Sequence, residues 1–278
     1  MIDEPKYANG GFVTADFNIG SPLVHNDYFI PTPLSEKLKS NTKSMIGIIP
    51  AAGRGTRAGG LPYPKELLPV RAENGKMITV IEGAIQQLAN AEIDQAVIVI
   101  RPEKQVIADY LGNERFGVNL MYRYQETMNS REGLPDAVLA GHVSAVPLYV
   151  MLMGDVYFTD PYVTRSLVIA MQYQLRAIAG VSLWKTSEPQ RFGIVQRSEH
   201  WVGAVIDKPS FVGTYEHWGA VAFRGAFWEF LRTETGTFSA ALDRAALYSD
   251  VLGIPAQGSY LDYGTPEAII NNIKVANS

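Results

Sequence analysis

Along residues 45–175, continuous apolar runs alternate with apolar residues at helical spacing. The runs at 45–51 and 95–100 predict buried strands, and the 3.6-residue spacing over 79–91 predicts an amphipathic helix. The expected elements that follow are a helix at 102–111, a strand at 118–125, a helix at 134–145, a strand at 148–158 that runs into a loop, and a helix at 161–175. This alternation is typical of a mainly parallel sheet covered by helices on both faces.

After residue 177 the pattern changes to short strand-like segments that follow one another closely. These segments are "AIAGVSLWK", "RFGIVQR", "WVGAVIDKP" and "HWGAVAFRG". We expect them to add antiparallel strands that form a small lobe over one end of the sheet. Helices at 226–232 and 238–249, a strand at 250–256 and a last helix at 265–275 complete the expected order.

Residues 1–44 lack any sustained hydrophobic period. Their aromatic residues are scattered among repeated Pro, Gly and Asn. We interpret 1–44 as an irregular N-terminal arm and 45–278 as one domain. The alternative is that 1–44 are a dispensable extension.

Composition narrows the class of protein. The 278 residues carry a net charge of -4, so no overall basic field favours nucleic acid. There is no Cys, which excludes disulfides, a thiolate nucleophile and a cysteine zinc site, and the four His residues show no metal-ligand spacing. No apolar run is long enough to span a membrane, and the N-terminus does not read as a signal peptide. We expect a soluble, cytoplasmic protein without a nucleic-acid or membrane partner.

The segment "IIPAAGRGTRAGGLPYPKELLPV" contains the pattern G-x-G-x-x-A at Gly53, Gly55 and Ala58, with Glu73 twenty positions after the first glycine. Read as a pattern, this is a dinucleotide-binding fingerprint. Such a site needs a long helix directly after the glycines. Two glycines and two prolines occupy that stretch instead, at Gly59, Gly60, Pro62 and Pro64. The dinucleotide interpretation therefore fails, because an interior proline costs a helix about 3 kcal/mol.

The same segment is typical of an anion-binding loop. Gly53 and Gly55 let backbone N–H groups face a ligand without a Cβ in the way. Arg57 adds a planar phosphate donor and Lys65 a mobile positive charge. The Walker pattern is absent. Such groups suit a triphosphate attacked at phosphorus, which requires positioning and charge neutralisation rather than a covalent nucleophile.

"AAGRGTR" followed by "PKELLPV" resembles the G-x-G-T-R…P-K signature of the sugar-1-phosphate nucleotidyltransferases. The resemblance continues in chain order through "QETMNSREGLPDAVLAG", "LMGDVYF", "QRFGIV", "VIDKP" and "YLDYGTPEAI". It implies a Rossmann-like three-layer α/β/α fold with a mixed, mainly parallel central sheet and a small antiparallel sugar-binding lobe. It also implies transfer of a nucleotidyl group from a nucleoside triphosphate to a sugar 1-phosphate, with release of pyrophosphate.

The resemblance implies a role for each matching residue. Arg57 and Lys65 would be catalytic, since they would neutralise charge on the α-phosphate and the departing pyrophosphate. The nucleotide would be bound by Ala52, Gly53, Gly55, Gln125, Gly133 and Asp155. The sugar phosphate would be bound by Gly193, Asp207 and Lys208, and Mg²⁺ by Asp155 and Asp262.

The implied mechanism is in-line attack of an acceptor phosphate oxygen on the α-phosphorus, which needs no general base because the phosphate is already anionic. Asp207 stands where the family has Glu, and the E-[IL]-T-D segment is not recognisable. "PAAG" and the Gln125 segment favour a pyrimidine triphosphate. Two alternatives stay open: a cytidylyltransferase with a non-sugar phosphate acceptor, and a catalytically silent regulatory relative. The sugar, the pathway and the oligomeric state, a homo-oligomer included, are not determined.

Overall fold

The structure is a computed structural model that describes residues 45–276 apart from 73, 126–132 and 234–235. The expected N-terminal arm at 1–44 lies outside the described residues, as does Glu73 of the rejected fingerprint. The first described strand, β1, begins at Met45, where the hydrophobic pattern begins.

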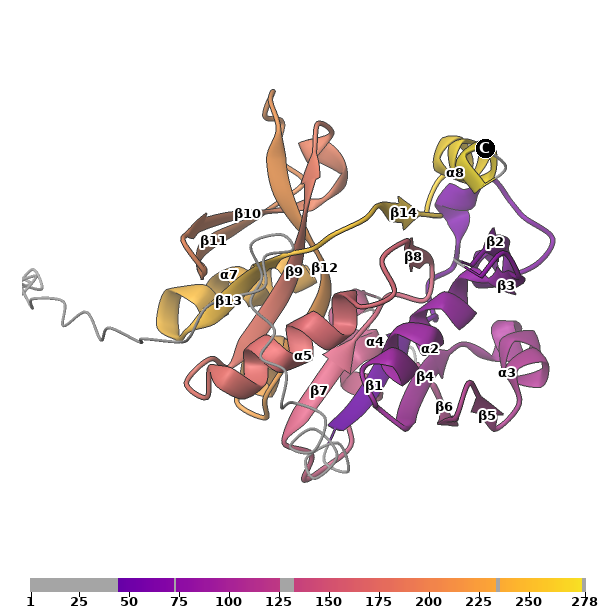
Figure 1. Ribbon diagram of the computed structural model, residues 1–278, viewed down its shortest axis with the longest axis horizontal. Coiled ribbons are helices and arrows are strands. Elements are labelled where there is room, and N and C mark those ends of the chain that lie inside the picture. The colour runs from indigo at the N-terminus through magenta and orange to yellow at the C-terminus, as the bar shows by residue number, and fades with distance from the viewer. Residues whose placement is uncertain (1–44, 73, 126–132, 234–235, 277–278) are drawn as a thin grey trace, which may run out of the picture.

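One large mixed sheet runs through the described part of the chain (Figure 1). Its order is β10 (Gly193–Ser198), β11 (Trp201–Asp207), β13 (Val251–Pro255), β9 (Ala179–Thr186), β12 (Tyr215–Phe223), β7 (Leu148–Met151), β1 (Met45–Pro50), β4 (Gln95–Ile100), β6 (Val118–Tyr124) and β5 (Glu114–Arg115). The neighbouring strands β7, β1, β4 and β6 run parallel to one another. Strand β12 joins this parallel group to the rest by antiparallel pairing with both β7 and β9.

The described helices are α2 (Val80–Asn90), α3 (Gln105–Leu111), α4 (Leu134–Ala140), α5 (Val163–Tyr173), α6 (Phe227–Thr233), α7 (Phe238–Tyr248) and α8 (Pro266–Ala276). Helix α2 begins where the sequence predicts, because Thr79 and Glu82 form a capping box at its first turn. Short 3₁₀ helices are η2 (Thr56–Ala58), η3 (Lys65–Leu67), η4 (Pro102–Lys104) and η5 (Pro189–Arg191). None of these described helices has both the length and the apolar content that a membrane span requires.

Hydrophobic cores cover both faces of the sheet. In β1, Met45 and Ile49 pack into one core with α2 and α5, whereas Ile46 and Ile48 pack into the other with α4, α6 and α7. This division follows from the alternation of side chains along a strand. Buried strands with apolar side chains on both faces therefore produce the continuous apolar runs seen in the sequence.

Two small two-stranded sheets lie outside the main one. Strands β2 (Pro69–Arg71) and β3 (Met77–Thr79) pair antiparallel, and β8 (Val156–Phe158) pairs antiparallel with β14 (Tyr260–Asp262). A third core joins these sheets to α8, with Val70, Tyr157 and Tyr263 among its buried members. The pairing of β8 with β14 brings together segments about a hundred residues apart in the chain.

The α/β class and the mixed sheet agree with the sequence prediction, and three local expectations need correction. The expected helix at 134–145 ends at Ala140, with Gly141 as its C-cap. The expected single strand at 148–158 is divided into β7 and β8 by a turn. Strand β9, expected to be antiparallel, pairs parallel with β13 on one side and antiparallel with β12 on the other.

Candidate active site

A cavity of about 630 Å³ is lined both by the loop after β1 and by residues of the antiparallel part of the sheet. Each residue that the sequence singled out lines this cavity: Ala52, Gly53, Gly55, Arg57, Lys65, Gln125, Gly133, Asp155, Gly193, Asp207, Lys208 and Asp262. Ligands of α/β proteins bind at the carboxyl ends of parallel strands, and the loops after β1 and β7 lie there. Folding thus gathers residues from many segments of the chain into one place.

The glycine-rich loop after β1 has the open geometry of an anion-binding loop. Gly55 has a φ of 67°, a left-handed conformation that favours glycine. A Cβ at Gly53 would meet no atom within 4 Å, so a ligand can approach the backbone there. Only the three-residue η2 follows, in place of the long helix that a dinucleotide site requires. Arg57 lies in η2 and faces the cavity.

Lys65 in η3 is buried and paired with a carboxylate of the cavity. Its Nζ donates to Asp155 Oδ2, and only 8% of its side chain is exposed. Burial lowers the pKa of Lys65, but the charge of Asp155 and the hydrogen bond to it raise that pKa more, so the net shift is upward. Lys65 therefore carries a positive charge at neutral pH. A buried cation at this position can stabilise negative charge on a phosphate.

A second buried ion pair supports the loop from beneath, and sequence reasoning missed it. Lys104 Nζ lies 2.7 Å from Glu66 Oε1 and donates to the Ala51 carbonyl at 2.9 Å. Burial raises the pKa of Glu66 although Lys104 acts in the opposite direction. Because Glu66 follows Lys65 directly, this pair connects η3 to the end of β1 and so positions Lys65. No local pattern indicates that residues 66 and 104 meet.

Asp155 and Asp262 lie side by side because β8 pairs with β14. Asp262 is opposite Val156 in that pair, and Tyr263 N donates to the Asp155 carbonyl at 3.0 Å. The Asp262 carboxylate accepts from Gly264 N at 2.7 Å. A Cβ at Gly264 would stand 2.8 Å from Asp262 Oδ1, so a side chain there would displace this carboxylate.

These two carboxylates suit a hard divalent cation. The described part of the chain holds no cluster of three or more His, Cys, Asp or Glu side chains that could bind a metal alone. Mg²⁺ commonly takes one or two carboxylates from the protein and its remaining ligands from water and substrate phosphates. The pair Asp155 and Asp262 fits that kind of site.

Arg191 is a further charged residue of the cavity that sequence reasoning did not select. It ends η5, and its guanidinium donates to Asp262 Oδ2 at 3.1 Å and to Glu188 Oε2 at 2.9 Å. This ion pair connects the antiparallel part of the sheet to β14. The only sequence signal is the position of Arg191 two residues before Gly193 in "RFGIV".

Gly193, Asp207 and Lys208 form the far end of the cavity. Gly193 lies opposite Asp207 in the pair of β10 with β11. A Cβ at Gly193 would collide with Trp218 and Ser239, and Trp218 Nε1 donates to Ser239 Oγ at 3.1 Å. Trp218 and Ser239, also missed in the sequence, thus close this end and require glycine at 193. Lys208 has a φ of 45°, a strained value for a residue with a side chain.

Gln125 and Gly133 lie at the opposite end. Gln125 is 8% exposed, and its Nε2 donates to the Gly133 carbonyl at 3.4 Å. Gly133 is the N-cap of α4, and its N–H donates to Asp136 Oδ2 at 3.2 Å. Residues 126–132 between them, which the motif also includes, lie outside the described residues.

The sequence matches known proteins over most of the described domain. A family model described as "Nucleotidyl transferase" matches residues 46–273. Two curated relatives from Staphylococcus saprophyticus are UTP–glucose-1-phosphate uridylyltransferases 1 and 2. The first relative is 25% identical over 197 residues, which cover 60% of this chain and 66% of the relative. The second is 23% identical over 192 residues, which cover 58% of this chain and 64% of the relative. The chain thus matches slightly less than two thirds of the length of either relative.

Solved structures share the fold at low identity. One, described as a putative glucose-1-phosphate thymidylyltransferase from Bacillus anthracis in complex with a sucrose, superposes with a TM-score of 0.73 at 22% identity, covering 84% of this chain and 96% of that one. A UDP-glucose pyrophosphorylase complexed with UDP-glucose superposes with a TM-score of 0.71 at 20% identity, covering 84% and 98%. At such identities the likeness shows the fold alone.

Proposed function

The chain belongs to the nucleotidyl transferase family, as its sequence motifs predicted, and on this basis we propose that it joins a nucleoside triphosphate to a sugar 1-phosphate and releases pyrophosphate. The observation that carries the proposal is the convergence of the predicted site residues, from Ala52 to Asp262, on one cavity. The names of the relatives support the same reaction class.

In the proposed reaction an oxygen of the acceptor phosphate attacks the α-phosphorus, and the bond to the β-phosphate oxygen breaks. Arg57 and Lys65 neutralise the charge that develops on the α-phosphate and on the departing pyrophosphate. The open backbone at Gly53 receives the phosphates. Lys208 binds the acceptor phosphate, and Gly193, which lines the same end of the cavity, contacts the sugar through its backbone.

Asp155 and Asp262 would hold Mg²⁺, and a bound ion would supply positive charge to the phosphate oxygens. Lys65 pairs with Asp155 and Arg191 pairs with Asp262, so each of these two carboxylates faces one positive charge.

We assign Gln125 to the base of the nucleotide. One Nε2 hydrogen donates to the Gly133 carbonyl, which leaves Oε1 and the second Nε2 hydrogen for a ligand. This acceptor and donor can meet the N3–H and a carbonyl oxygen of uracil or thymine, and equally the N4–H and N3 of cytosine. UTP or dTTP is the proposed nucleotide because the relatives are named for uridylyl and thymidylyl transfer, and cytidine triphosphate is the weaker candidate.

A pyrophosphate-release assay tests the proposal. UTP, dTTP, CTP, ATP and GTP are each incubated with a set of hexose 1-phosphates, and with choline phosphate as a non-sugar acceptor. Release with UTP or dTTP and a sugar 1-phosphate is expected. Release only with CTP and choline phosphate would replace the proposal by the non-sugar alternative. If no pair releases pyrophosphate while UTP still binds, the chain is a silent relative and the proposal is wrong.

A further inference from the structure

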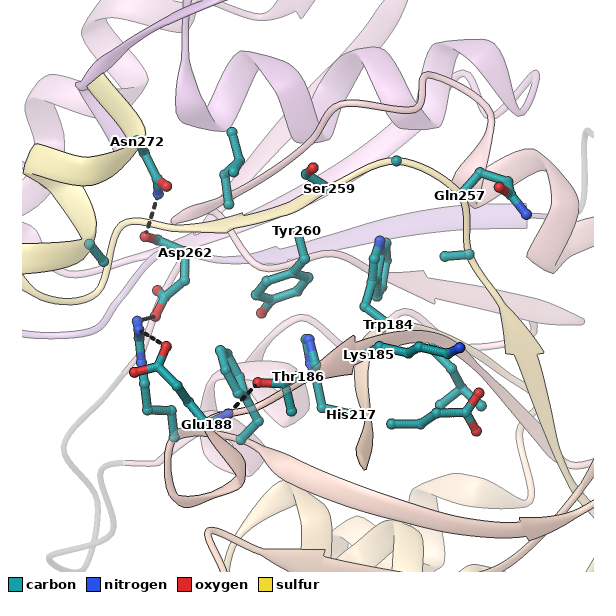
Figure 2. A pocket seen from close by; sticks show the side chains of 18 of the residues that line it. Trp184, Lys185, Thr186, Glu188, His217, Gln257, Ser259, Tyr260, Asp262 and Asn272 are labelled. Carbon is teal, nitrogen blue, oxygen red and sulfur yellow. Dashed lines mark hydrogen bonds and ion pairs between the residues drawn. The ribbon is translucent and has the colours of Figure 1, made fainter. Parts of the chain in front are cut away.

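A second cavity of about 800 Å³ adjoins the candidate active site (Figure 2). It is built by the end of β9, the turn that contains η5, the start of β12, the segment 255–262 and one face of α8. It shares Arg191, Phe192, Tyr260 and Asp262 with the first cavity. Its volume lies within the ~300–1,000 Å³ typical of small-molecule sites, and the proposed reaction does not use it.

The floor of the second cavity is aromatic. His217 stacks on Phe192 with ring centroids 4.2 Å apart and meets Tyr260 edge to face at 4.7 Å. Tyr260 in turn meets Trp184 edge to face at 5.2 Å. In Figure 2 the Tyr260 and Trp184 rings stand next to each other above His217. Flat rings of this kind offer an apolar surface to the C–H groups of a sugar ring.

The charges of the second cavity do not suit an anion. Three carboxylates and two cations line it: Glu188, Glu216, Asp262, Lys185 and Arg191. Arg191 is already paired with Glu188 and Asp262, and Glu216 accepts from Arg197 at 2.7 Å. With Arg197 included, three cations face three carboxylates, so the cavity offers a phosphate no excess of positive charge. An uncharged ligand requires no such excess.

His217 presents a hydrogen-bond acceptor in the floor. Its side chain is almost fully buried, and burial lowers its pKa to about 4, so the ring is neutral at pH 7. Nδ1 lies 3.1 Å from the Trp218 carbonyl. Since a carbonyl only accepts, Nδ1 carries the hydrogen and Nε2 carries a lone pair. A hydroxyl group is a suitable donor to Nε2.

Neutral polar side chains surround the floor. Thr186, Gln257, Ser259 and Asn271 come from β9, from the segment before β14 and from α8, and all line the cavity. Hydroxyl and amide groups around aromatic rings can recognise several hydroxyls at once. From the floor, the charges and these side chains, we propose that the second cavity binds an uncharged saccharide unit.

The unit has two sources, a free sugar or the far end of an extended acceptor. Tyr260 and Asp262 line both cavities, so an extended acceptor would reach from one cavity into the other. Only the extended acceptor, and not the free sugar, rests on the proposed function. Binding of a free sugar does not depend on nucleotidyl transfer.

Ligand-observed NMR with a panel of uncharged sugars tests the site. The probes are methyl α-glucoside, methyl α-galactoside, N-acetylglucosamine, sucrose and maltose, with wild type, His217→Phe, Gln257→Ala and the matched control Gln174→Ala. Gln174 is exposed and lines neither cavity. We expect saturation transfer to at least one sugar, and affinity lower by about fivefold in each cavity variant, as for loss of one hydrogen bond, but not in the control.

Two results overturn the proposal: no sugar binds the folded wild type, or binding is unchanged in both cavity variants.

A second assay compares glucose 1-phosphate with maltose 1-phosphate as acceptor. A rise in KM for maltose 1-phosphate alone in Gln257→Ala identifies an extended acceptor, and an equal KM in wild type and variant identifies a free sugar. If no pyrophosphate is released but sugar binding behaves as expected, the proposed function fails and the saccharide site stands.

Discussion

The Arg191 guanidinium donates to Asp262 Oδ2 at 3.1 Å, so an arginine from the antiparallel part of the sheet neutralises a carboxylate that we assign to a metal. Both side chains are partly buried, with 30% and 24% exposed. The arginine and a metal ion would compete for the same oxygen. The positive charge of Arg191 also repels a cation nearby.

Replacement of Arg191 by Ala is therefore expected to lower the Mg²⁺ concentration that gives half-maximal activity. The expected change is several-fold, as for a partly exposed ion pair worth about 1 kcal/mol. Arg191→Lys keeps the charge and should change less. Pyrophosphate release measured over a range of Mg²⁺ concentrations gives the concentration for half-maximal activity. An unchanged or higher value in Arg191→Ala would show that Arg191 and Mg²⁺ do not compete.

Lys65→Ala and Arg57→Ala are each expected to lower kcat by about 100-fold or more, because a charge-stabilising group at a reacting centre contributes about 3–4 kcal/mol. Both residues line the cavity, whereas Arg71 is exposed on β2 and does not. Arg71→Ala is the matched control. Near-normal turnover by a folded Lys65→Ala protein would remove Lys65 from the mechanism.

Activity is expected to require Mg²⁺ or Mn²⁺, and Asp155→Asn should abolish most of it. The amide keeps the shape of the carboxylate but loses the charge that binds a hard cation. Asp136, which accepts from Gly133 N away from the carboxylate pair, provides the comparison Asp136→Asn. Pyrophosphate release by protein treated with EDTA would contradict the metal assignment.

Lys104→Met is expected to lower the free energy of unfolding by about 3–5 kcal/mol, because Glu66 is left as a buried charge without its partner. The double variant Glu66→Gln with Lys104→Met should recover much of that loss, since no charge remains buried. Urea unfolding of the two variants and the wild type measures both values. Equal destabilisation by the single and the double variant would show that packing, not the unpaired charge, dominates.

Stability is expected to fall between pH 6.5 and pH 4 through His217. The folded protein holds the pKa of His217 at about 4, below the ordinary value of 6.5. In that window the unfolded chain binds a proton that the folded chain does not, so the free energy of unfolding decreases as the pH falls. The full effect is about 3 kcal/mol. His217→Phe should have a smaller difference in unfolding free energy between pH 7 and pH 5 than the wild type, and an equal difference would exclude His217 as the cause.

Local sequence was sufficient for most helices, for most strands of the main sheet and for the glycine-rich loop. The apolar runs of β1 and β4 and the helical spacing of α2 depend on neighbours in the chain, so a linear pattern reveals them. Gly55 has a left-handed φ, which glycine adopts without support from tertiary contacts. Asp155 and Asp262 could be joined to Arg57 and Lys65 in one predicted site only through resemblance to a family, since their positions in the chain do not bring them near the loop.

Tertiary structure decided which charges meet. Lys104 pairs with Glu66, Arg191 pairs with Asp262, and the rings of Trp184, His217 and Tyr260 gather in a second cavity. These contacts join residues distant in the chain, and they form only after strand pairing such as that of β8 with β14 sets the register. Burial, which shifts the pKa of Glu66 and His217, is likewise a property of the packed protein. The sequence therefore determined which reactive groups exist, and the packing determined which of them act together.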